Sequence, residues 1–145
     1  MKQSQALAIL SSGVPVFLTG APGSGKTYVL NEFVDQARAQ GLTVAMTAST
    51  GIAATHINGQ TIHAWSGVGL DTVLTPDVLK RIKTRRRKAI KATDVLVIDE
   101  VSMIHAWLLD MVDEACRAIK RSDQPFGGIQ VVMSGDLYQL PPVSK

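Results

Sequence analysis

Apolar side chains recur at helical spacing after residue 26 and form short unbroken runs elsewhere in the chain. The helical positions are Leu30, Phe33, Val34 and Ala37. They fall on one face of an α-helix, and Gly41 follows where a C-terminal cap is expected. Largely apolar runs predict buried strands over residues 16–19, 42–47, 95–98 and 129–133. Strands that are largely apolar along their length are typical of a parallel sheet covered on both faces.

Three further stretches have helical periodicity, over residues 5–10, 77–91 and 103–120. The last has an apolar stripe, which predicts a helix packed against the sheet. Its members are Ile104, Leu108, Met111, Ala115 and Ile119. A strand, helix and parallel strand require a right-handed crossover, which places the helix on one face of the sheet. With 145 residues and 46% hydrophobic content, the chain is expected to form one α/β domain.

The junction between the first strand and its helix has the spacing Gly20-x-x-x-x-Gly25-Lys26-Thr27 of a phosphate-binding loop. Its glycines let successive backbone N–H groups point into one concavity, and the helix adds its own unsatisfied N–H groups. Lys26 is expected to reach the terminal phosphates and the Thr27 hydroxyl to ligate Mg²⁺. The alternative is an ordinary glycine-rich turn. The candidate nucleotide-binding residues of the loop are Gly20, Ala21, Pro22, Gly23, Ser24, Gly25, Lys26 and Thr27.

Two carboxylates follow the apolar run at residues 95–98. A buried strand that ends in Asp99 and Glu100, downstream of a phosphate loop, has the layout of a Walker B strand. Asp99 is expected to hold Mg²⁺ through its water shell, and Glu100 to orient or deprotonate the attacking water. The strand at residues 129–133 also leads into a polar loop, residues 134–142, at the same edge.

Small hydroxylated residues dominate residues 48–70, where a ligand backbone could be held at the carboxyl ends of the strands. His63 is either a capping histidine or a ligand contact. Trp65 is more often a packing residue than a base-stacking platform.

Eight of the fifteen basic residues lie within residues 80–91. They are Lys80, Arg81, Lys83, Arg85, Arg86, Arg87, Lys88 and Lys91. Such a run is usually a solvated helix face, and contact with a phosphate backbone is the alternative.

The remaining composition excludes several classes. The single cysteine, Cys116, rules out a disulfide framework or a four-cysteine zinc site, and its apolar surroundings favour a core role. No apolar run approaches the roughly 18 residues that span a bilayer, so no membrane association is expected. The N-terminus has no signal-peptide pattern, so we expect a protein that is not exported.

Several strings together resemble the Pif1 family of superfamily 1 DNA helicases. They are the phosphate loop, residues 47–54, residues 61–63, the segment around Asp99 and Glu100, and residues 124–142. The resemblance implies a three-layer P-loop NTPase domain of RecA-like fold, the first motor domain of a 5′-to-3′ DNA helicase. It also implies that the strand at 129–133 lies between the strands that carry the phosphate loop and Asp99.

The resemblance also implies residue roles. Gln5 matches the glutamine that reads adenine, although residues 1–4 are an imperfect version of that motif. Lys26 and Glu100 match the phosphate lysine and the catalytic acid, and Gln139 matches a sensor of the γ-phosphate. Thr27 and Asp99 match the magnesium partners. The residues that match contacts to single-stranded DNA are Thr50, Gly51 and His63.

The sequence stops at Lys145, just after the sensor motif. The resemblance therefore leads us to expect a truncated motor in which the second RecA-like domain and its arginine finger are missing. Such a chain should bind ATP and hydrolyse it poorly, because an arginine finger can contribute about 10³ to 10⁵ in rate. The expected location is the nucleoid-associated cytoplasm in a prokaryote, or the nucleus or mitochondrion in a eukaryote. Roles in DNA repair, recombination and telomere maintenance are implied in the same way.

Three other interpretations stay open at this point. A small-molecule kinase would share the phosphate loop but would need a mobile lid and an acceptor site. A stand-alone module could use ATP only to order residues 48–70 for DNA or a partner. Within the helicases, a RecD-like or relaxase-linked enzyme is the further alternative.

Overall fold

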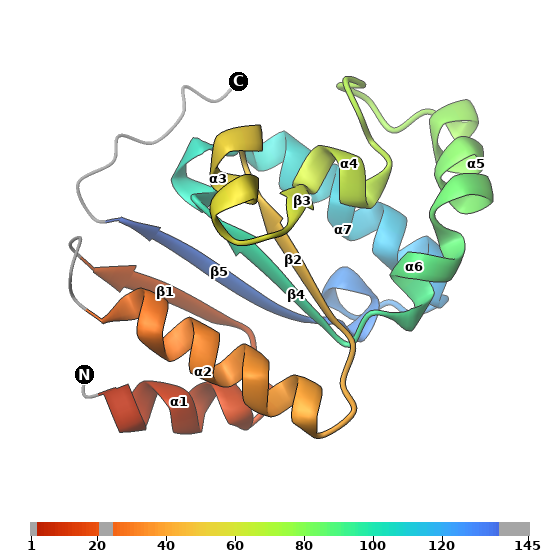
Figure 1. Ribbon diagram of the computed structural model, residues 1–145. Coiled ribbons are helices and arrows are strands. Elements are labelled where there is room, and N and C mark those ends of the chain that lie inside the picture. The colour runs from red at the N-terminus through yellow and green to blue at the C-terminus, as the bar shows by residue number, and fades with distance from the viewer. Residues whose placement is uncertain (1–2, 21–24, 137–145) are drawn as a thin grey trace.

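The structure is a computed structural model that describes residues 3–20 and 25–136. Its centre is a five-stranded parallel sheet in the order β1-β5-β4-β2-β3 (Figure 1). The strands are β1 (Val16–Gly20), β2 (Val44–Ala48), β3 (Gln60–Thr61), β4 (Val95–Asp99) and β5 (Gln130–Asp136). The strand nearest the end of the described chain, β5, thus lies between β1 and β4, which confirms the predicted insertion.

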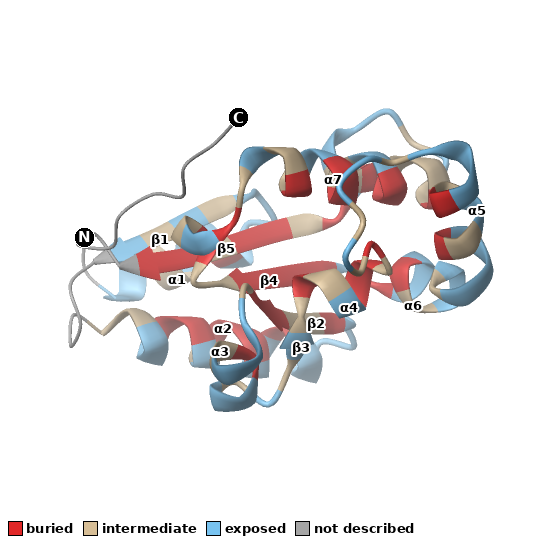
Figure 2. Cartoon of the chain, turned by 90° about the horizontal axis from the view of Figure 1, so that it is seen from above, coloured by how far each residue is buried: buried red, intermediate tan, exposed pale blue. Residues whose placement is uncertain are grey.

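Helices cover both faces of the sheet, as the α/β prediction requires (Figures 1 and 2). One face packs against α1 (Gln3–Ser11) and α2 (Lys26–Ala39). The other packs against α4 (Ile62–Ser66), α5 (Pro76–Arg85), α6 (Arg87–Ala92) and α7 (Ala106–Lys120). β4 shows the division clearly, because Val95 and Val97 belong to the first core while Leu96 and Ile98 belong to the second.

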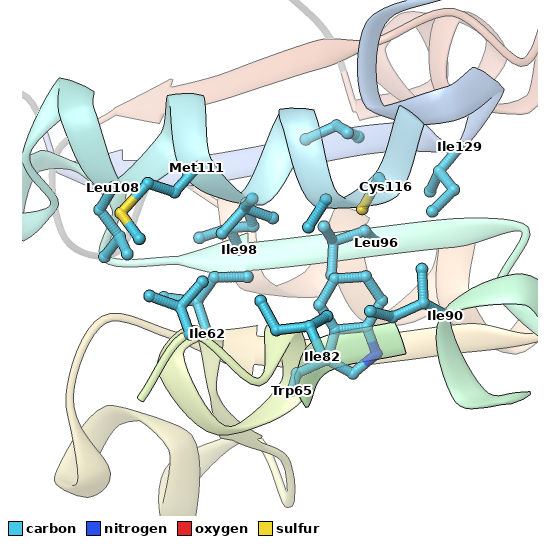
Figure 3. Packing of buried hydrophobic residues seen from close by; sticks show 14 of the residues in the cluster. Ile62, Trp65, Ile82, Ile90, Leu96, Ile98, Leu108, Met111, Cys116 and Ile129 are labelled. Carbon is cyan, nitrogen blue, oxygen red and sulfur yellow. The ribbon is translucent and has the colours of Figure 1, made fainter. Parts of the chain in front are cut away.

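The larger core lies between α7, the sheet and the α4–α6 segment (Figure 3). Trp65 is buried there at 2% exposure, so the prediction of a packing role is confirmed. Cys116 is also fully buried, and burial, followed by the charge of Asp113, raises the pKa of its thiol to about 12. A thiol that stays protonated is a core residue and a poor nucleophile.

The first boundary that differs from prediction is the start of the second strand. The sequence pattern predicts a strand over 42–47, but β2 begins at Val44. The Leu42 N–H donates to Ala37 O and the Gly41 N–H to Arg38 O, each at 3.0 Å. These two bonds are a Schellman cap with Gly41 at a φ of 88°, so the backbone of Leu42 completes α2 and is not free for the sheet.

The predicted basic helix over 77–91 is wrong as one element, because it is broken into α5 and α6 at Arg86. Arg86 has φ −119° and ψ 1°, outside the helical region, and its side-chain Nε donates to the carbonyl of Trp65 at 2.9 Å. Ile82 of α5 and Ile90 of α6 are both fully buried in the core. A side-chain bond to another segment therefore sets where the first helix ends.

Other segments also depart from the predicted boundaries, among them α1, which spans 3–11 where the pattern predicts 5–10. Residues 48–70 contain α3 (Gly51–His56), β3 and α4. The helix predicted from residue 103 begins at Ala106, after the short 3₁₀ turn η1 (Val101–Met103). The turn predicted at 122–128 contains the 3₁₀ element η2 (Pro125–Gly128), and β5 extends beyond the predicted 129–133. In the described part of the chain, no helix combines the length and apolar character that a membrane crossing needs.

Candidate nucleotide and nucleic-acid site

The carboxyl ends of the strands bring the predicted residues to one edge of the sheet. Gly20 at the end of β1 is in register with Asp136 of β5, and Ala48 of β2 is in register with Asp99 of β4. Every strand of the sheet runs in the same direction, so these ends share one edge. That is the edge at which open α/β sheets hold their ligands.

The described part of the phosphate loop has the geometry that the motif requires. Gly25 has a φ of 89°, which a residue with a side chain rarely adopts, and it is the N-cap of α2. Lys26 and Thr27 follow as the first residues of the helix, with Lys26 half-buried and Thr27 exposed. The helix N-terminus therefore starts where the phosphates are expected. The loop residues Ala21, Pro22, Gly23 and Ser24 lie outside the described residues.

A hollow of about 400 Å³ opens beside this helix start. Its lining comes from α1, β1 and α2, namely Gln3, Ala6, Phe17, Leu18, Thr19, Gly25, Lys26 and Val29. The walls combine apolar side chains with the ammonium-bearing side chain of Lys26. This composition is suited to a nucleotide, whose base is largely apolar and whose phosphates are charged.

Gln3, rather than Gln5, is the glutamine that lines this hollow. A Cβ added at Gly25 would overlap the side-chain amide of Gln3, so the two residues are in direct contact. Ala6, Leu7 and Leu10 pack α1 against the first core, and Gln3 continues that helical face. Gln5 is exposed. The sequence signal that could have selected Gln3 is this spacing of 3, 6, 7 and 10.

Asp99 is held in place by a second strand. Ser134 Oγ on β5 donates to Asp99 Oδ1 at 2.5 Å, and Ser134 is only 1% exposed. The hydroxyl fixes one carboxylate oxygen within the sheet, because a buried serine has few other acceptors. Sequence reasoning missed Ser134, since nothing in the pattern pairs this serine with a residue 35 positions earlier.

Glu100 lies just beyond the strand in an unusual conformation. Its φ of 57° and ψ of 40° are in the left-handed region, which is uncommon for a residue with a side chain. Glu100 forms the turn between β4, which ends at Asp99, and η1, which begins at Val101. Strained residues of this kind concentrate at functional sites, where they re-aim a side chain.

The predicted DNA contacts lie on the short helices that follow β2. Thr50 is the N-cap of α3 and accepts from the Ala53 N–H at 3.2 Å, while Gly51 is the first residue of that helix. Both are accessible to a ligand, Gly51 fully and Thr50 at the helix start. His63 is half-buried on α4, where its carbonyl accepts from Gly69 N–H at 3.1 Å. The histidine therefore contributes to the fold through its backbone and keeps part of its ring surface exposed.

Ser49 adds unused hydrogen-bonding capacity at this edge. Its N–H donates to Asp99 O at 3.2 Å, but its hydroxyl oxygen is buried and, within the described residues, has no partner. Gln139, the predicted γ-phosphate sensor, lies outside the described residues.

A phosphate-binding loop and a carboxylate strand at one edge of a parallel sheet, with a third strand between them, define a P-loop NTPase domain of RecA-like architecture. A family model described as PIF1-like helicase matches residues 2–145. The chain belongs to this family. The family assignment replaces the small-molecule kinase interpretation.

Known relatives extend well beyond the matched region. The ATP-dependent DNA helicase Pif1 of Psychrobacter sp. (strain PRwf-1) is 52% identical over 147 residues, which cover 100% of this chain and 22% of that protein. The crystal structure of Pif1 helicase from Candida albicans matches with a TM-score of 0.90 at 41% identity, over 97% of this chain and 33% of that one. Pif1 helicase from Bacteroides in complex with ADP-AlF3 and ssDNA matches with a TM-score of 0.77 at 33% identity, over 99% and 33%. The chain therefore spans about a fifth of the curated relative.

Proposed function

We propose that these residues are the ATP-binding and ATP-hydrolysing motor half of a Pif1-like 5′-to-3′ DNA helicase that acts on single-stranded DNA. The observation that carries the proposal is the meeting of Lys26, Asp99 and α3 at one edge of the sheet. A nucleotide and a DNA strand bound there would share that edge. The Bacteroides relative, which was crystallised with ADP-AlF3 and ssDNA, supports the proposal.

Each residue of the nucleotide half has a distinct role in this proposal. Lys26 neutralises charge on the terminal phosphates, while the N–H groups at the start of α2 bind phosphate oxygens. Glu100 accepts a proton from the attacking water or orients it. Gln3 supplies amide groups that read the edge of the adenine, because it lines the hollow beside Gly25. The family resemblance favours Gln5 for this last role, and substitution of each glutamine in turn distinguishes the two.

The side chains present fit a magnesium ion. Thr27 offers an exposed hydroxyl, and Asp99 offers a carboxylate whose orientation is fixed by Ser134. Mg²⁺ prefers such oxygen ligands and usually keeps several waters. Within the described residues there is no cluster of three or more acidic, histidine or cysteine side chains, in keeping with an ion held partly by phosphates. When bound, the ion neutralises charge that develops on the phosphate oxygens.

The DNA half of the proposal assigns Thr50, Gly51 and His63 to the sugar-phosphate backbone. Thr50 and Gly51 lie at the accessible start of α3, and hydroxyl and backbone N–H groups are common phosphate ligands. Residues 48–70 form two capped helices. A module in which ATP only orders this segment is the alternative to the motor.

Translocation is a property of two RecA-like domains, and we propose that these 145 residues do not step along DNA alone. Their own hydrolysis should be slow, because the rate contribution of an arginine finger is about 10³ to 10⁵. Gln139 is proposed as the γ-phosphate sensor that links the two domains. The proposed location is wherever the DNA lies, the nucleoid in a prokaryote and the nucleus or mitochondrion in a eukaryote.

A pair of substitutions tests the nucleotide chemistry. Lys26→Ala should abolish ATP binding in calorimetry, because the phosphate charge loses its closest cation. Glu100→Gln should bind ATP as the parent does and lose the residual hydrolysis, measured as phosphate release with single-stranded DNA present. ATP binding by Lys26→Ala at the parental affinity would contradict the site. Unchanged turnover in Glu100→Gln would remove this carboxylate from catalysis.

A further inference from the structure

A second surface of the protein is strongly basic and lies away from the nucleotide edge. It consists of the outward sides of α5 and α6 together with Arg121, the residue after α7. α6 ends shortly before β4 begins, so this surface is at the edge where strands start. The five residues of β4, at about 3.3 Å each, put roughly 16 Å between the two edges. Figures 1 and 2 both show α5 and α6 on the flank opposite β1.

Two of the eight basic residues in the run 80–91 are used within the protein. Arg81 Nη2 donates to Gly67 O at 2.8 Å and pairs with Asp71 Oδ2 at 2.8 Å. Arg86 Nε donates to Trp65 O at 2.9 Å. Both side chains fasten the α4 region to α5 and α6. The rest of the run therefore needs another explanation.

The other six cations are exposed, and no carboxylate of the described chain forms an ion pair with them. They are Lys80, Lys83, Arg85, Arg87, Lys88 and Lys91. The sequence has no acidic residue from 78 to 93. Ion pairing within the fold thus leaves this charge uncompensated, and like charges this close repel one another.

Three cations from three different elements converge at one point of this surface. Lys83 of α5, Arg87 of α6 and Arg121 line a small hollow of about 70 Å³ whose floor is Ala118 and Ile119. The volume is comparable to that of a single phosphate group. Convergence of cations from separate elements on an apolar floor differs from a helix face that merely happens to be solvated.

The backbone at Arg121 gives independent support. Its φ of 52° and ψ of 51° lie in the left-handed conformation, at the C-cap of α7. Glycine or asparagine is the usual residue where a helix ends in this conformation, because other side chains are strained there. A glycine would suit this backbone better, so the arginine side chain stands at this point at a cost in backbone strain.

We propose that this surface, centred on Lys83, Arg87 and Arg121, binds the phosphate backbone of duplex DNA. Residues 80–91 extend for at most about 18 Å as helix, a length over which a duplex carries about ten phosphate charges. Residues 78–92 contain no aromatic side chain, whereas sites for single strands usually stack bases on aromatic rings. Contact would be independent of DNA sequence and would hold the double-stranded arm of a junction while the other edge holds the single strand. The proposal rests on DNA as the substrate but not on ATP hydrolysis.

Anisotropy of a labelled blunt duplex, measured from about 50 to 200 mM salt, tests the proposal. The variant Lys83→Gln/Arg87→Gln/Arg121→Gly should lower the slope of log affinity against log salt by about 0.9 for each phosphate that its side chains no longer neutralise. Affinity at the lowest salt should fall by about tenfold or more. An unchanged slope and affinity would overturn the proposal.

Two single substitutions separate binding from folding. Arg121→Gly should weaken duplex binding while the melting temperature stays equal or rises, because glycine relieves the left-handed backbone. Arg38→Gln removes the same charge from α2, on the opposite face, and should leave duplex binding unchanged. If Arg121→Gly lowers the melting temperature and binds duplex as the parent does, the arginine is structural and the proposal fails.

The outcomes also distinguish this inference from the proposed function. If Lys26→Ala binds ATP at the parental affinity while the triple variant loses duplex affinity, the proposed nucleotide site fails and the basic surface stands. If ATP and single-stranded DNA bind as expected but the triple variant keeps its duplex affinity, only the basic surface fails.

Discussion

Removing the hydroxyl of Ser134 should weaken Mg²⁺ binding at the proposed magnesium site in addition to lowering the stability of the fold. Ser134→Ala deletes the 2.5 Å bond to Asp99 Oδ1. A hydrogen bond to a charged group contributes about 1.5 to 3 kcal/mol. For a chain of this size that corresponds to a melting temperature lower by roughly 3 to 12 °C. The carboxylate also becomes free to rotate, so the concentration of Mg²⁺ that half-saturates nucleotide binding should rise by about tenfold. A tenfold change corresponds to about 1.4 kcal/mol, close to the lower end of the hydrogen-bond energy range.

The matched control is another buried hydroxyl beside the same strand. Thr47 Oγ1 donates to Val97 O at 2.6 Å and is fully buried, but its acceptor is a neutral backbone carbonyl and not a proposed magnesium ligand. Thr47→Val should lower stability by about 1 kcal/mol and leave the Mg²⁺ dependence unchanged. The assay is calorimetric ATP binding at a series of free Mg²⁺ concentrations, with thermal melts of each variant. If Ser134→Ala melts early but keeps the parental Mg²⁺ midpoint, Ser134 is structural and the positioning argument is refuted.

Three further substitutions or reactions test other contacts. Gln3→Ala should reduce the preference for ATP over GTP by several-fold in competition binding. Gln5→Ala should leave this preference unchanged. The reverse pattern would identify Gln5 as the adenine-reading residue. Arg86→Ala removes a bond to Trp65 O and packing against Gly67, so it should lower the free energy of unfolding by about 1 to 3 kcal/mol in urea titrations. An unchanged midpoint would show that these Arg86 contacts do not stabilise the fold. Cys116, with its pKa raised to about 12, should react with iodoacetamide at about pH 8 only as fast as the protein unfolds, and rapid labelling of the native state would contradict its burial.

The elements that local patterns specify were predictable from the sequence. α2 has its apolar face and its glycine cap within a short stretch of chain, and β4 is a run of four apolar residues before Asp99. The described end of the phosphate loop is equally local, because Gly25, Lys26 and Thr27 are consecutive at the start of α2. What these features share is that the relevant interactions lie close together in the sequence.

The features that were missed depend on contacts between distant segments. Arg86 ends α5 because it binds a carbonyl 21 residues earlier, and Ser134 orients Asp99 from 35 residues later. Leu42 is apolar enough for a strand, but its backbone N–H is used by the cap of α2. Periodicity alone does not determine any of these contacts.

The position of β5 has a consequence for how the chain folds during synthesis. β1 pairs only with β5 among the described strands, so residues 16–20 have no partner until residues 130–136 have left the ribosome. Gln130 reinforces this dependence, since its side-chain amide donates to Leu10 O and Val14 O at 2.8 and 2.9 Å. Pairings so distant in sequence form slowly, because closing a long loop comes before any gain from contact. The α2 segment is made early, but the sheet edge beside it is completed late, so nascent chains should acquire ATP binding only after β5 has inserted.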